Sequence, residues 1–289
     1  MTFTLLDGGV GQELHRRMGG PAGALWAARA LDQRPDLVET VHDEFLTAGA
    51  DVITLASYSV TPSRLARAGL EDQFKPLQRK AADAADRARR KRAPAARVAG
   101  CLPPLPGSYR PGEAPPQAQA REEYARITDV QGDRVDLFLC ETLTTVAEAG
   151  QAAETASAAG FETWAAFCVD ETDGARLRGG EPLLEGADAA RRAGASRILI
   201  NCSPPEAATT GLHTLLDAGF TAGAYANGFE TVDPMAAGAT VDALKARRDL
   251  DPGAYADIAM GWVEAGAGVV GGCCEISPAH IAEIARRRG

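Results

Sequence analysis

The sequence predicts an α/β protein built as a single (β/α)8 barrel, the fold class known as the TIM barrel. Two observations carry this prediction. Eight short apolar runs alternate with long Ala-rich amphipathic segments, and an Ala-Gly pair precedes several of those runs. Eight strand signals separated by helix signals in 289 residues suit a closed barrel. A doubly wound open sheet shares this alternation and is the competing fold.

Each apolar run is short and rich in aliphatic residues, as expected for a parallel strand that is buried on both faces. Turn and helix signals bound each run, which supports strands rather than buried helices. The predicted strands are Thr4–Leu6, Asp51–Leu55, Arg97–Cys101, Val135–Cys140, Thr163–Cys168, Arg197–Asn201, Phe220–Tyr225 and Gly268–Gly271.

The segments between the strands have the length and spacing of amphipathic helices. Predicted helices include Asp36–Ala48, Phe74–Lys91, Val146–Ala159, Leu183–Ala193 and Asp257–Ala265. Glycine after alanine supplies a left-handed helix C-cap just before the next strand. The five such pairs are Ala48-Gly49, Ala159-Gly160, Ala193-Gly194, Ala218-Gly219 and Ala265-Gly266.

The segment Pro103–Gln119 is rich in Pro and Gly and follows the third predicted strand. We expect a long loop at the mouth of the barrel, which is either a lid or a disordered surface loop. No change of composition marks a linker. Residues 1–289 are therefore predicted to form one domain.

Composition argues against several classes of protein. Lys and Arg number 30 against 39 Asp and Glu, and the basic segment Arg87–Arg92 suits the last turn of a helix, so no nucleic-acid partner is predicted. No apolar run approaches the roughly 20 residues that span a membrane. The first residues lack the features of a signal peptide, which predicts a cytoplasmic protein. Its six cysteines are then thiols or metal ligands rather than disulfides. The sequence predicts no particular oligomeric state.

Three cysteines directly follow two of the predicted strands. Cys202 comes after the sixth strand, and Cys273 with Cys274 comes after the eighth. Barrels place their chemistry at the carboxyl ends of the strands, and these two strands flank the seventh, so the three thiols share one sector of the rim. Three thiolates without a fourth protein ligand match a catalytic zinc site with one open position.

For two adjacent cysteines to bind one ion, the chain must turn at that point. We expect Gly271 and Gly272 to permit the turn, because Gly tolerates positive φ and close approach. Packing is the alternative for any free Cys, and it is our interpretation of Cys101, Cys140 and Cys168, which also lie at strand ends. A redox-active vicinal disulfide between Cys273 and Cys274 is a further alternative.

These cysteine motifs resemble the zinc signature of the homocysteine S-methyltransferases, and the resemblance runs nearly end to end. Beside Asn201-Cys202 and Gly271-Gly272-Cys273-Cys274, six other segments match in order. They are Leu6-Asp7-Gly8-Gly9, Ser57-Tyr58, Val98-Ala99-Gly100, Cys140-Glu141-Thr142-Leu143, Tyr225-Ala226-Asn227-Gly228 and Ser277-Pro278-Ala279-His280-Ile281.

The resemblance implies a (β/α)8 barrel with Zn²⁺ held by Cys202, Cys273 and Cys274. It also implies that Glu141 binds the amino group of homocysteine. The remaining substrate-binding residues that it implies are Asp7, Gly8, Gly9, Ser57, Tyr58 and Asn227. Two structural alternatives remain. The Glu141 carboxylate, beside Thr142, could have its hydrogen bonds satisfied within the fold, and Asp7 could be only a helix N-cap.

The implied activity is transfer of a methyl group from a small donor to the homocysteine thiolate, which gives methionine. A free thiol is only about 3% ionised at pH 7, and zinc coordination deprotonates it. S-Methylmethionine or S-adenosylmethionine is the favoured donor, and betaine comes second. Departures from the family pattern at Leu55, Pro103-Pro104 and Ala226-Asn227-Gly228 lie near the substrate pockets and leave the donor open.

Three other functions compete with this one. The chain could be a non-catalytic zinc- or thiol-binding barrel, or a methyltransferase that uses another thiol or a selenol as acceptor. It could also be a metal-free aldolase with a Schiff-base lysine. The aldolase is disfavoured, because no lysine of the chain follows a predicted strand; the lysines are Lys75, Lys80, Lys91 and Lys245.

Overall fold

Eight parallel strands form a closed barrel in this computed structural model, which describes residues 2–21, 23 and 25–288. The strand order is β1-β8-β7-β6-β5-β4-β3-β2. A parallel bridge between Leu6 and Val52 joins β1 to β2, and the Asp7 N–H donates to the Val52 carbonyl at 3.0 Å, which closes the ring. The strands are β1 (Thr4–Leu5), β2 (Val52–Thr54), β3 (Arg97–Leu102), β4 (Leu137–Leu143), β5 (Thr163–Phe167), β6 (Arg197–Asn201), β7 (Ala222–Tyr225) and β8 (Val269–Val270). The predicted (β/α)8 barrel is confirmed, and the open sheet is wrong.

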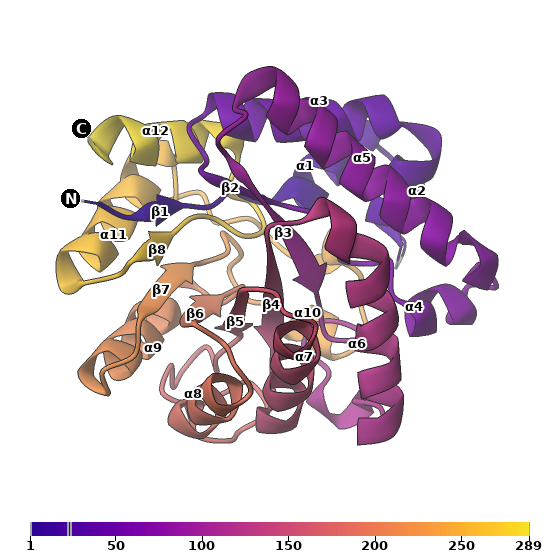
Figure 1. Cartoon of the computed structure of the whole chain (residues 1–289). Coiled ribbons are helices and arrows are strands. Elements are labelled where there is room, and N and C mark those ends of the chain that lie inside the picture. The colour runs from indigo at the N-terminus through magenta and orange to yellow at the C-terminus, as the bar shows by residue number, and fades with distance from the viewer. Residues whose placement is uncertain (1, 22, 24, 289) are drawn as a thin grey trace.

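Helices surround the strands on the outside of the barrel (Figure 1). Each strand is followed by at least one helix before the next strand begins, as the alternation in the sequence predicts. The α-helices are α1 (Val10–Met18), α2 (Trp26–Gln33), α3 (Pro35–Thr47), α4 (Pro62–Arg67), α5 (Phe74–Arg92), α6 (Gln117–Gln131), α7 (Val146–Ala158), α8 (Leu183–Arg192), α9 (Pro205–Asp217), α10 (Asp233–Ala236), α11 (Pro252–Ala265) and α12 (Pro278–Arg288).

Buried side chains form an inner and an outer layer. The outer layer packs the helices onto the strands, and buried alanines on α5 and α7 allow these two helices to lie close to the sheet. The inner layer fills the barrel, and its largest member is Trp164, which is 1% exposed. Arg97 and Arg197 lie over the Trp164 ring, 5.9 and 5.2 Å from its centroid. Because Trp164 lies near the start of β5, the amino-terminal end of the barrel is filled and the opposite end remains for a site.

The structure confirms the position of every predicted strand but moves some ends. The largest change is in β4, which we expected to end at Cys140. It continues to Leu143 through a shift of register, with Thr142 at φ +61°. Two loop and helix boundaries also differ from expectation: α11 begins at Pro252 rather than Asp257, and α6 already begins at Gln117. The irregular end of β4 matters because it carries Glu141.

The predicted glycine caps are confirmed. All five glycines of the Ala-Gly pairs have φ between 78° and 115°. The basic segment Arg87–Arg92 is the end of α5, where Arg87 pairs with Glu39 at 2.7 Å and Arg92 pairs with Asp43 at 2.9 Å. In the part of the chain that the structure describes, no helix combines the length and apolar character needed to cross a membrane.

Candidate metal centre and substrate pocket

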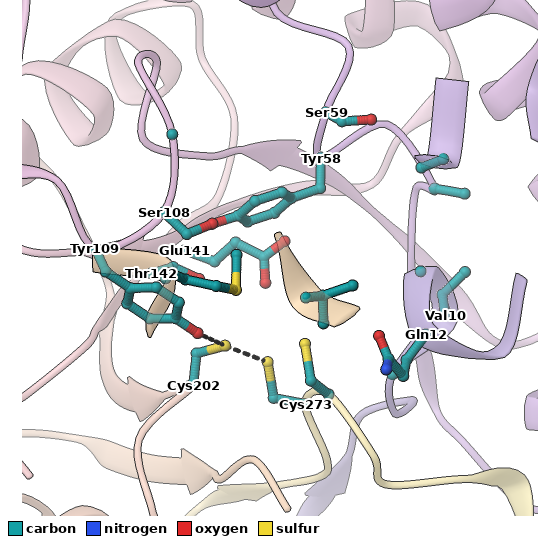
Figure 2. A pocket seen from close by; sticks show the side chains of 18 of the residues that line it. Val10, Gln12, Tyr58, Ser59, Ser108, Tyr109, Glu141, Thr142, Cys202 and Cys273 are labelled. Atoms are coloured by element: carbon teal, nitrogen blue, oxygen red, sulfur yellow. Dashed lines mark hydrogen bonds between the residues drawn. The ribbon is translucent and has the colours of Figure 1, made fainter. Parts of the chain in front are cut away.

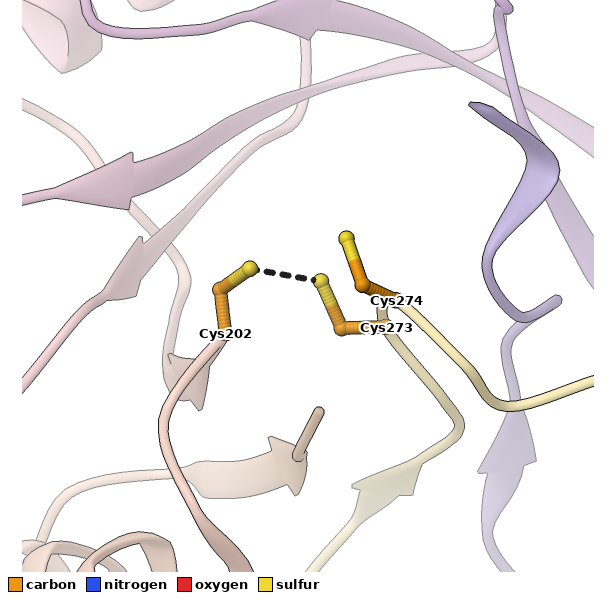
Figure 3. Close-up of side chains that lie close together, drawn as sticks. All are labelled: Cys202, Cys273 and Cys274. Carbon is orange, nitrogen blue, oxygen red and sulfur yellow. Dashed lines mark hydrogen bonds between the residues drawn. The ribbon is translucent and has the colours of Figure 1, made fainter. Parts of the chain in front are cut away.

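The three predicted zinc ligands converge at the carboxyl end of the barrel. Figure 3 shows the side chains of Cys202, Cys273 and Cys274 close together. Their sulfur atoms all lie within 4.8 Å of one another, and the Cys202 and Cys273 sulfurs are 3.0 Å apart. Cys202 is 5% exposed, and the other two cysteines are partly buried. Elsewhere in the described ranges, no comparable group of three His, Cys, Asp or Glu side chains comes together.

A tight turn after β8 brings both adjacent cysteines to the same side. The backbone N–H of Ile276 donates to the Cys273 carbonyl at 3.1 Å, and Glu275 takes the left-handed conformation at φ +67°. We expected Gly271 and Gly272 to permit this turn through positive φ or close approach, and neither glycine has positive φ. Their role is space: a Cβ on Gly272 would lie 2.2 Å from the Ile276 side chain, and one on Gly271 would lie 2.6 Å from Leu6.

Asn201 links the strand end that carries Cys202 to the strand end that carries Glu141. Its side-chain oxygen accepts from the Thr142 N–H at 2.9 Å, and its amide donates to the Thr142 hydroxyl at 3.0 Å. Asn201 is fully buried. Cys202, the next residue, has φ +50°, so the chain leaves β6 sharply there. The positions of the sulfur cluster and of Glu141 are therefore fixed relative to each other.

Hydrogen bonds decide how the three thiols share their protons. Bonds from Cys273 and Cys274 lower the pKa of Cys202 well below its usual range, and the Tyr109 hydroxyl contributes to the same effect. The bonds to Cys202 also raise the pKa of Cys273 and of Cys274. The cluster thus favours one thiolate and two neutral thiols when no cation is present. A bound cation would displace the two remaining protons.

The geometry and chemistry of this cluster fit zinc. Zn–S bonds of about 2.3 Å in a tetrahedron place sulfurs about 3.8 Å apart, which small side-chain adjustments provide here. Three thiolates would satisfy three positions and leave the fourth for an exogenous ligand. The cluster opens on a cavity of about 420 Å³, so that ligand can come from solution.

The cavity lies between the sulfur cluster and the segment that follows β3. Figure 2 shows Tyr58, Ser108, Tyr109 and Glu141 facing the cysteines across it. Of the residues predicted to bind substrate, Asp7, Gly8, Gly9, Tyr58 and Glu141 line the cavity. The structure therefore brings five of those positions to the cysteines.

Glu141 projects from the irregular end of β4 and is the titratable group beside the cysteines. Its carboxylate accepts from the Cys101 thiol at 3.0 Å and from the Tyr225 hydroxyl at 3.4 Å. Burial raises the pKa of Glu141 to about 7, and the nearby Cys202 adds to this rise. The carboxylate thus has two hydrogen-bond partners within the chain, and neither is Thr142, whose hydroxyl bonds to Asn201.

Asp7 provides a second carboxylate in the cavity wall, and it is buried, with 4% of its surface exposed. It accepts from the Thr54 N–H at 2.8 Å, whereas α1 is preceded by Gly9 without a side-chain cap, so the N-cap alternative is wrong. Burial raises the pKa of Asp7 well above its usual range, and Glu141 raises it further. Two neighbouring carboxylates whose pKa values are raised by burial form a favourable site for a cation.

The glycines after Asp7 allow the cysteine turn to approach α1. A Cβ on Gly8 would lie 2.2 Å from the Ile276 carbonyl, and one on Gly9 would lie 2.8 Å from the Cys273 carbonyl. The Gly9 N–H already donates to the Ile276 carbonyl at 2.9 Å, so it is occupied within the chain. Both glycines thus serve the packing of the metal-ligand turn as well as the wall of the cavity.

The segment after β3 covers the cavity and contributes a residue that the sequence did not indicate. The hydroxyl of Tyr109 lies 3.0 Å from the Cys202 sulfur, and Tyr109 is 4% exposed. Next to it, the Ser108 hydroxyl lies 2.8 Å from that of Tyr58. Arg178 stacks over the Tyr109 ring at 5.4 Å. We expected this segment to be either a lid or a disordered surface loop. The structure shows it covering the site.

Two predicted substrate residues do not reach the cavity. The hydroxyl of Ser57 accepts from the Gln131 amide at 3.2 Å, within a buried polar group behind the wall. The side-chain oxygen of Asn227 accepts from the Phe229 N–H at 3.0 Å and so shapes the turn after β7. Neither residue lines the cavity in this structure.

Packing alone describes only one of the other three cysteines. Cys140 lies in the core between strands and helices. Cys101 donates to Glu141, as described above, and burial raises the pKa of its thiol well above the usual range. The Cys168 thiol lies 3.5 Å from the Cys202 carbonyl and supports that turn. The one feature of the sequence that could have indicated these contacts of Cys101 and Cys168 is their position at the ends of β3 and β5.

Comparison with known proteins agrees with this site. A family model described as homocysteine S-methyltransferase matches residues 4–288. The chain is 30% identical to the homocysteine S-methyltransferase of Escherichia coli (strain K12), over 98% of this chain and 94% of that protein. It is 29% identical to homocysteine S-methyltransferase 4 of Zea mays, over 98% of this chain and 88% of that protein.

Solved structures show the same relationship. The metallated form of the homocysteine methyltransferase MmuM from Escherichia coli superposes with a TM-score of 0.80 at 27% identity. That match covers 99% of this chain and 96% of the MmuM chain. Fold, length and sequence agree over nearly the whole molecule, and the chain belongs to the homocysteine S-methyltransferase family.

Proposed function

We propose that this protein is a zinc-dependent enzyme that transfers a methyl group from a sulfonium donor to the sulfur of homocysteine, which gives methionine. The observation that carries the proposal is the convergence of three cysteine sulfurs within 4.8 Å of one another, at a cavity that is also lined by the buried Asp7 and the partly buried Glu141. Sulfur ligands suit zinc, and the carboxylates suit the ammonium group of an amino acid. The relatives named above carry the same activity in their names.

Cys202, Cys273 and Cys274 would hold the zinc ion. When bound, zinc would keep the acceptor sulfur deprotonated and electron-rich at neutral pH. The Tyr109 hydroxyl, 3.0 Å from the Cys202 sulfur, would orient that ligand and exclude water from one side of the cluster.

Glu141 and Asp7 would receive the ammonium group of homocysteine. Burial raises the pKa of both carboxylates, and Glu141 raises the pKa of Asp7 further. An ammonium group beside them would compensate that charge and lower the pKa of Glu141. The chain would thereby hold the acceptor at its amino end while its sulfur reaches the cysteine cluster.

The reaction needs only displacement at a methyl carbon. A new bond forms between the acceptor sulfur and the methyl carbon as the bond between that carbon and the donor sulfur breaks. The electron pair of the broken bond stays on the donor sulfur and neutralises the sulfonium, and the acceptor's thiol proton is released to solvent. The protein's contribution is to align the two molecules and to exclude water.

The cavity favours a small donor. Its volume of about 420 Å³ lies toward the lower end of the range of about 300–1,000 Å³ for small-molecule pockets. Two amino-acid-sized molecules suit that space better than homocysteine together with an adenosyl group. We therefore place S-methylmethionine before S-adenosylmethionine, with betaine after both.

Zinc content and donor-dependent turnover of the reduced protein test the proposal. We expect about one zinc per chain and methionine formation from homocysteine with a sulfonium donor. Cys202→Ala should lose both zinc and turnover while remaining folded. Cys140→Ala, which changes a core cysteine away from the cluster, should keep both. Wild-type protein that takes up no zinc, or a Cys202→Ala variant with normal turnover, would refute the mechanism.

A further inference from the structure

Arg64 is a charged residue in the cavity wall that the proposed chemistry has not used. It lies in the first turn of α4, where its backbone N–H donates to the Thr61 hydroxyl at 3.2 Å. Its guanidinium stacks over the Tyr58 ring, 5.0 Å from the centroid. The side chain is partly buried and lines the same cavity as Glu141 and the cysteines.

Two backbone carbonyls and the Tyr58 side chain hold the guanidinium in place. Its Nε donates to the Leu105 carbonyl at 3.3 Å, and Nη2 donates to the Pro104 carbonyl at 2.6 Å. Arginine has five N–H donors in a planar fork, so these two contacts leave donors for another partner. The contacts also fix the fork in one orientation, which lowers the entropy lost when it binds a planar anion.

The charge of Arg64 has no counterion within the described ranges. None of their carboxylates makes an ion pair with it, in contrast to Arg16 and Arg17, which pair with Glu13. Glu123 packs against the same helix but accepts from the Ser63 N–H and the Gln119 amide, at 3.0 Å each. Burial lowers the pKa of the Arg64 guanidinium, which nevertheless stays charged at neutral pH.

The wall of the cavity carries groups of both charges. Asp7 and Glu141 are its acidic groups, and the proposed function places the ammonium group of the acceptor there. Arg64 is one of its basic groups, and it stacks on Tyr58, which Figure 2 shows across the cavity from the cysteines. With the acceptor between the acidic groups and the cysteines, the second molecule has the space on the Tyr58 side, where Arg64 lies. A donor with a sulfonium near the cysteines and a carboxylate at its other end would match this arrangement.

We propose that Arg64 binds the carboxylate group of the methyl donor and so selects donors that are amino acids. This inference rests on the proposed function, because it assumes that a sulfonium donor shares the cavity with homocysteine. It assigns to Arg64 a contact with substrate rather than a part in the reaction itself. A charge-assisted fork to carboxylate is the strongest common form of such recognition.

Donor discrimination tests the inference. Turnover would be measured with S-methylmethionine and with its methyl ester, which keeps the sulfonium and the amine but has no carboxylate charge. We expect wild-type kcat/KM to favour S-methylmethionine by about tenfold or more. Arg64→Gln should bring that ratio close to one by lowering kcat/KM for S-methylmethionine alone, and Arg64→Lys should keep part of the ratio.

Arg126→Gln is the matched control, because Arg126 also stacks on an aromatic ring, Phe74 at 5.2 Å, but lies outside the cavity. An Arg64→Gln variant that loses kcat/KM equally for both donors would show a purely structural role and overturn the inference.

A second acceptor separates the two substrates. Decarboxylated homocysteine, 3-mercaptopropylamine, lacks the acceptor's carboxylate. If Arg64→Gln abolishes discrimination between the two acceptors and leaves donor discrimination intact, Arg64 binds the acceptor, and the donor assignment is wrong. Wild-type protein that uses no sulfonium donor would refute the proposed function and this inference with it. Normal turnover without donor discrimination would refute the inference alone.

Discussion

Binding of the product methionine should depend on the ionisation of Glu141. Methionine has the ammonium group that Glu141 is proposed to bind, but it has no thiol that titrates. The pKa of Glu141 is raised to about 7, first by burial and then by Cys202. Pairing with an ammonium group lowers this pKa, so binding releases a proton and strengthens as pH rises through 7.

The magnitude follows from the fraction of Glu141 that is ionised. With a pKa of about 7, roughly 10% is ionised at pH 6 and roughly 90% at pH 8. The methionine dissociation constant should therefore be about tenfold higher at pH 6 than at pH 8. Glu141→Gln should remove this dependence, and Glu141→Ala should weaken binding at pH 8 by about 2 kcal/mol or more.

Isothermal titration calorimetry at pH 6, 7 and 8 measures both quantities, and buffers of different ionisation enthalpy report the released proton. Glu148→Gln is the control, since burial also raises the pKa of Glu148 but its carboxylate accepts from Thr144 outside the cavity. Equal methionine affinity at pH 6 and pH 8 in the wild type would refute the reasoning. So would a Glu141→Gln variant that binds like the wild type at pH 8.

The stability of the ligand-free protein should change in the opposite direction. A carboxyl group whose pKa rises on folding destabilises the fold once pH exceeds its unfolded value of about 4.5, and the cost is complete above about 7. Glu141→Gln should therefore raise the free energy of unfolding at pH 8 by about 1–3 kcal/mol. Weaker binding together with higher stability would separate a lost contact from damage to the fold.

Three further predictions concern the cysteine turn, its cover and the core. Gly9→Ala should weaken zinc binding, because the new Cβ would lie 2.8 Å from the Cys273 carbonyl. Gly150→Ala is the control and should not weaken zinc binding, because Gly150 has open space around it in α7. Competition with a chromophoric chelator compares the zinc affinities of the two variants. By the same assay, Tyr109→Phe should raise the zinc dissociation constant about tenfold, since it removes the hydroxyl beside Cys202, and an unchanged constant would contradict that role. His42 is fully buried in α3, with neither ring nitrogen bonded within the described residues, and burial lowers its pKa to about 4. The unfolded chain then binds the extra proton as pH falls below about 6.5, so the wild type should lose about 2 kcal/mol between pH 7.5 and 5. In urea unfolding, the free energy of unfolding of His42→Leu should not show this loss of about 2 kcal/mol between pH 7.5 and 5. The exposed His213→Gln should behave like the wild type.

The barrel and the sulfur cluster were predictable because each depends on short-range patterns. Apolar runs bounded by glycine caps give the strands, and the order of parallel strands around a closed ring then places Cys202 near Cys273 and Cys274. The family resemblance added the placement of Glu141 and Asp7 in the cavity wall, which the structure supports.

The orientation of single side chains at strand ends was not predictable. The register shift in β4 has no periodic signal, yet it decides where Glu141 points. Ser57 belongs to the same motif as Tyr58, but its hydroxyl turns to Gln131, because the two residues lie in a turn after β2 where no strand alternation indicates which way a side chain points. Tyr109 reaches the cavity through the path of the segment after β3, and the Arg64 guanidinium on α4 is oriented by carbonyls of that same segment. Irregular segments carry no repeat from which such a path can be inferred.

The pair of hydrogen bonds between Asn201 and Thr142 has a consequence for the choice of acceptor. Those bonds join β4 to β6 across the buried end of β5, so the separation of the ammonium site from the sulfur site belongs to the rigid fold. The site then selects a proposed acceptor by the distance between its ammonium group and its sulfur. Homocysteine has two methylene carbons between its α-carbon and sulfur, and cysteine has one. A molecule of the wrong length can satisfy Glu141 or the metal ligands, but we expect it to satisfy only one of them.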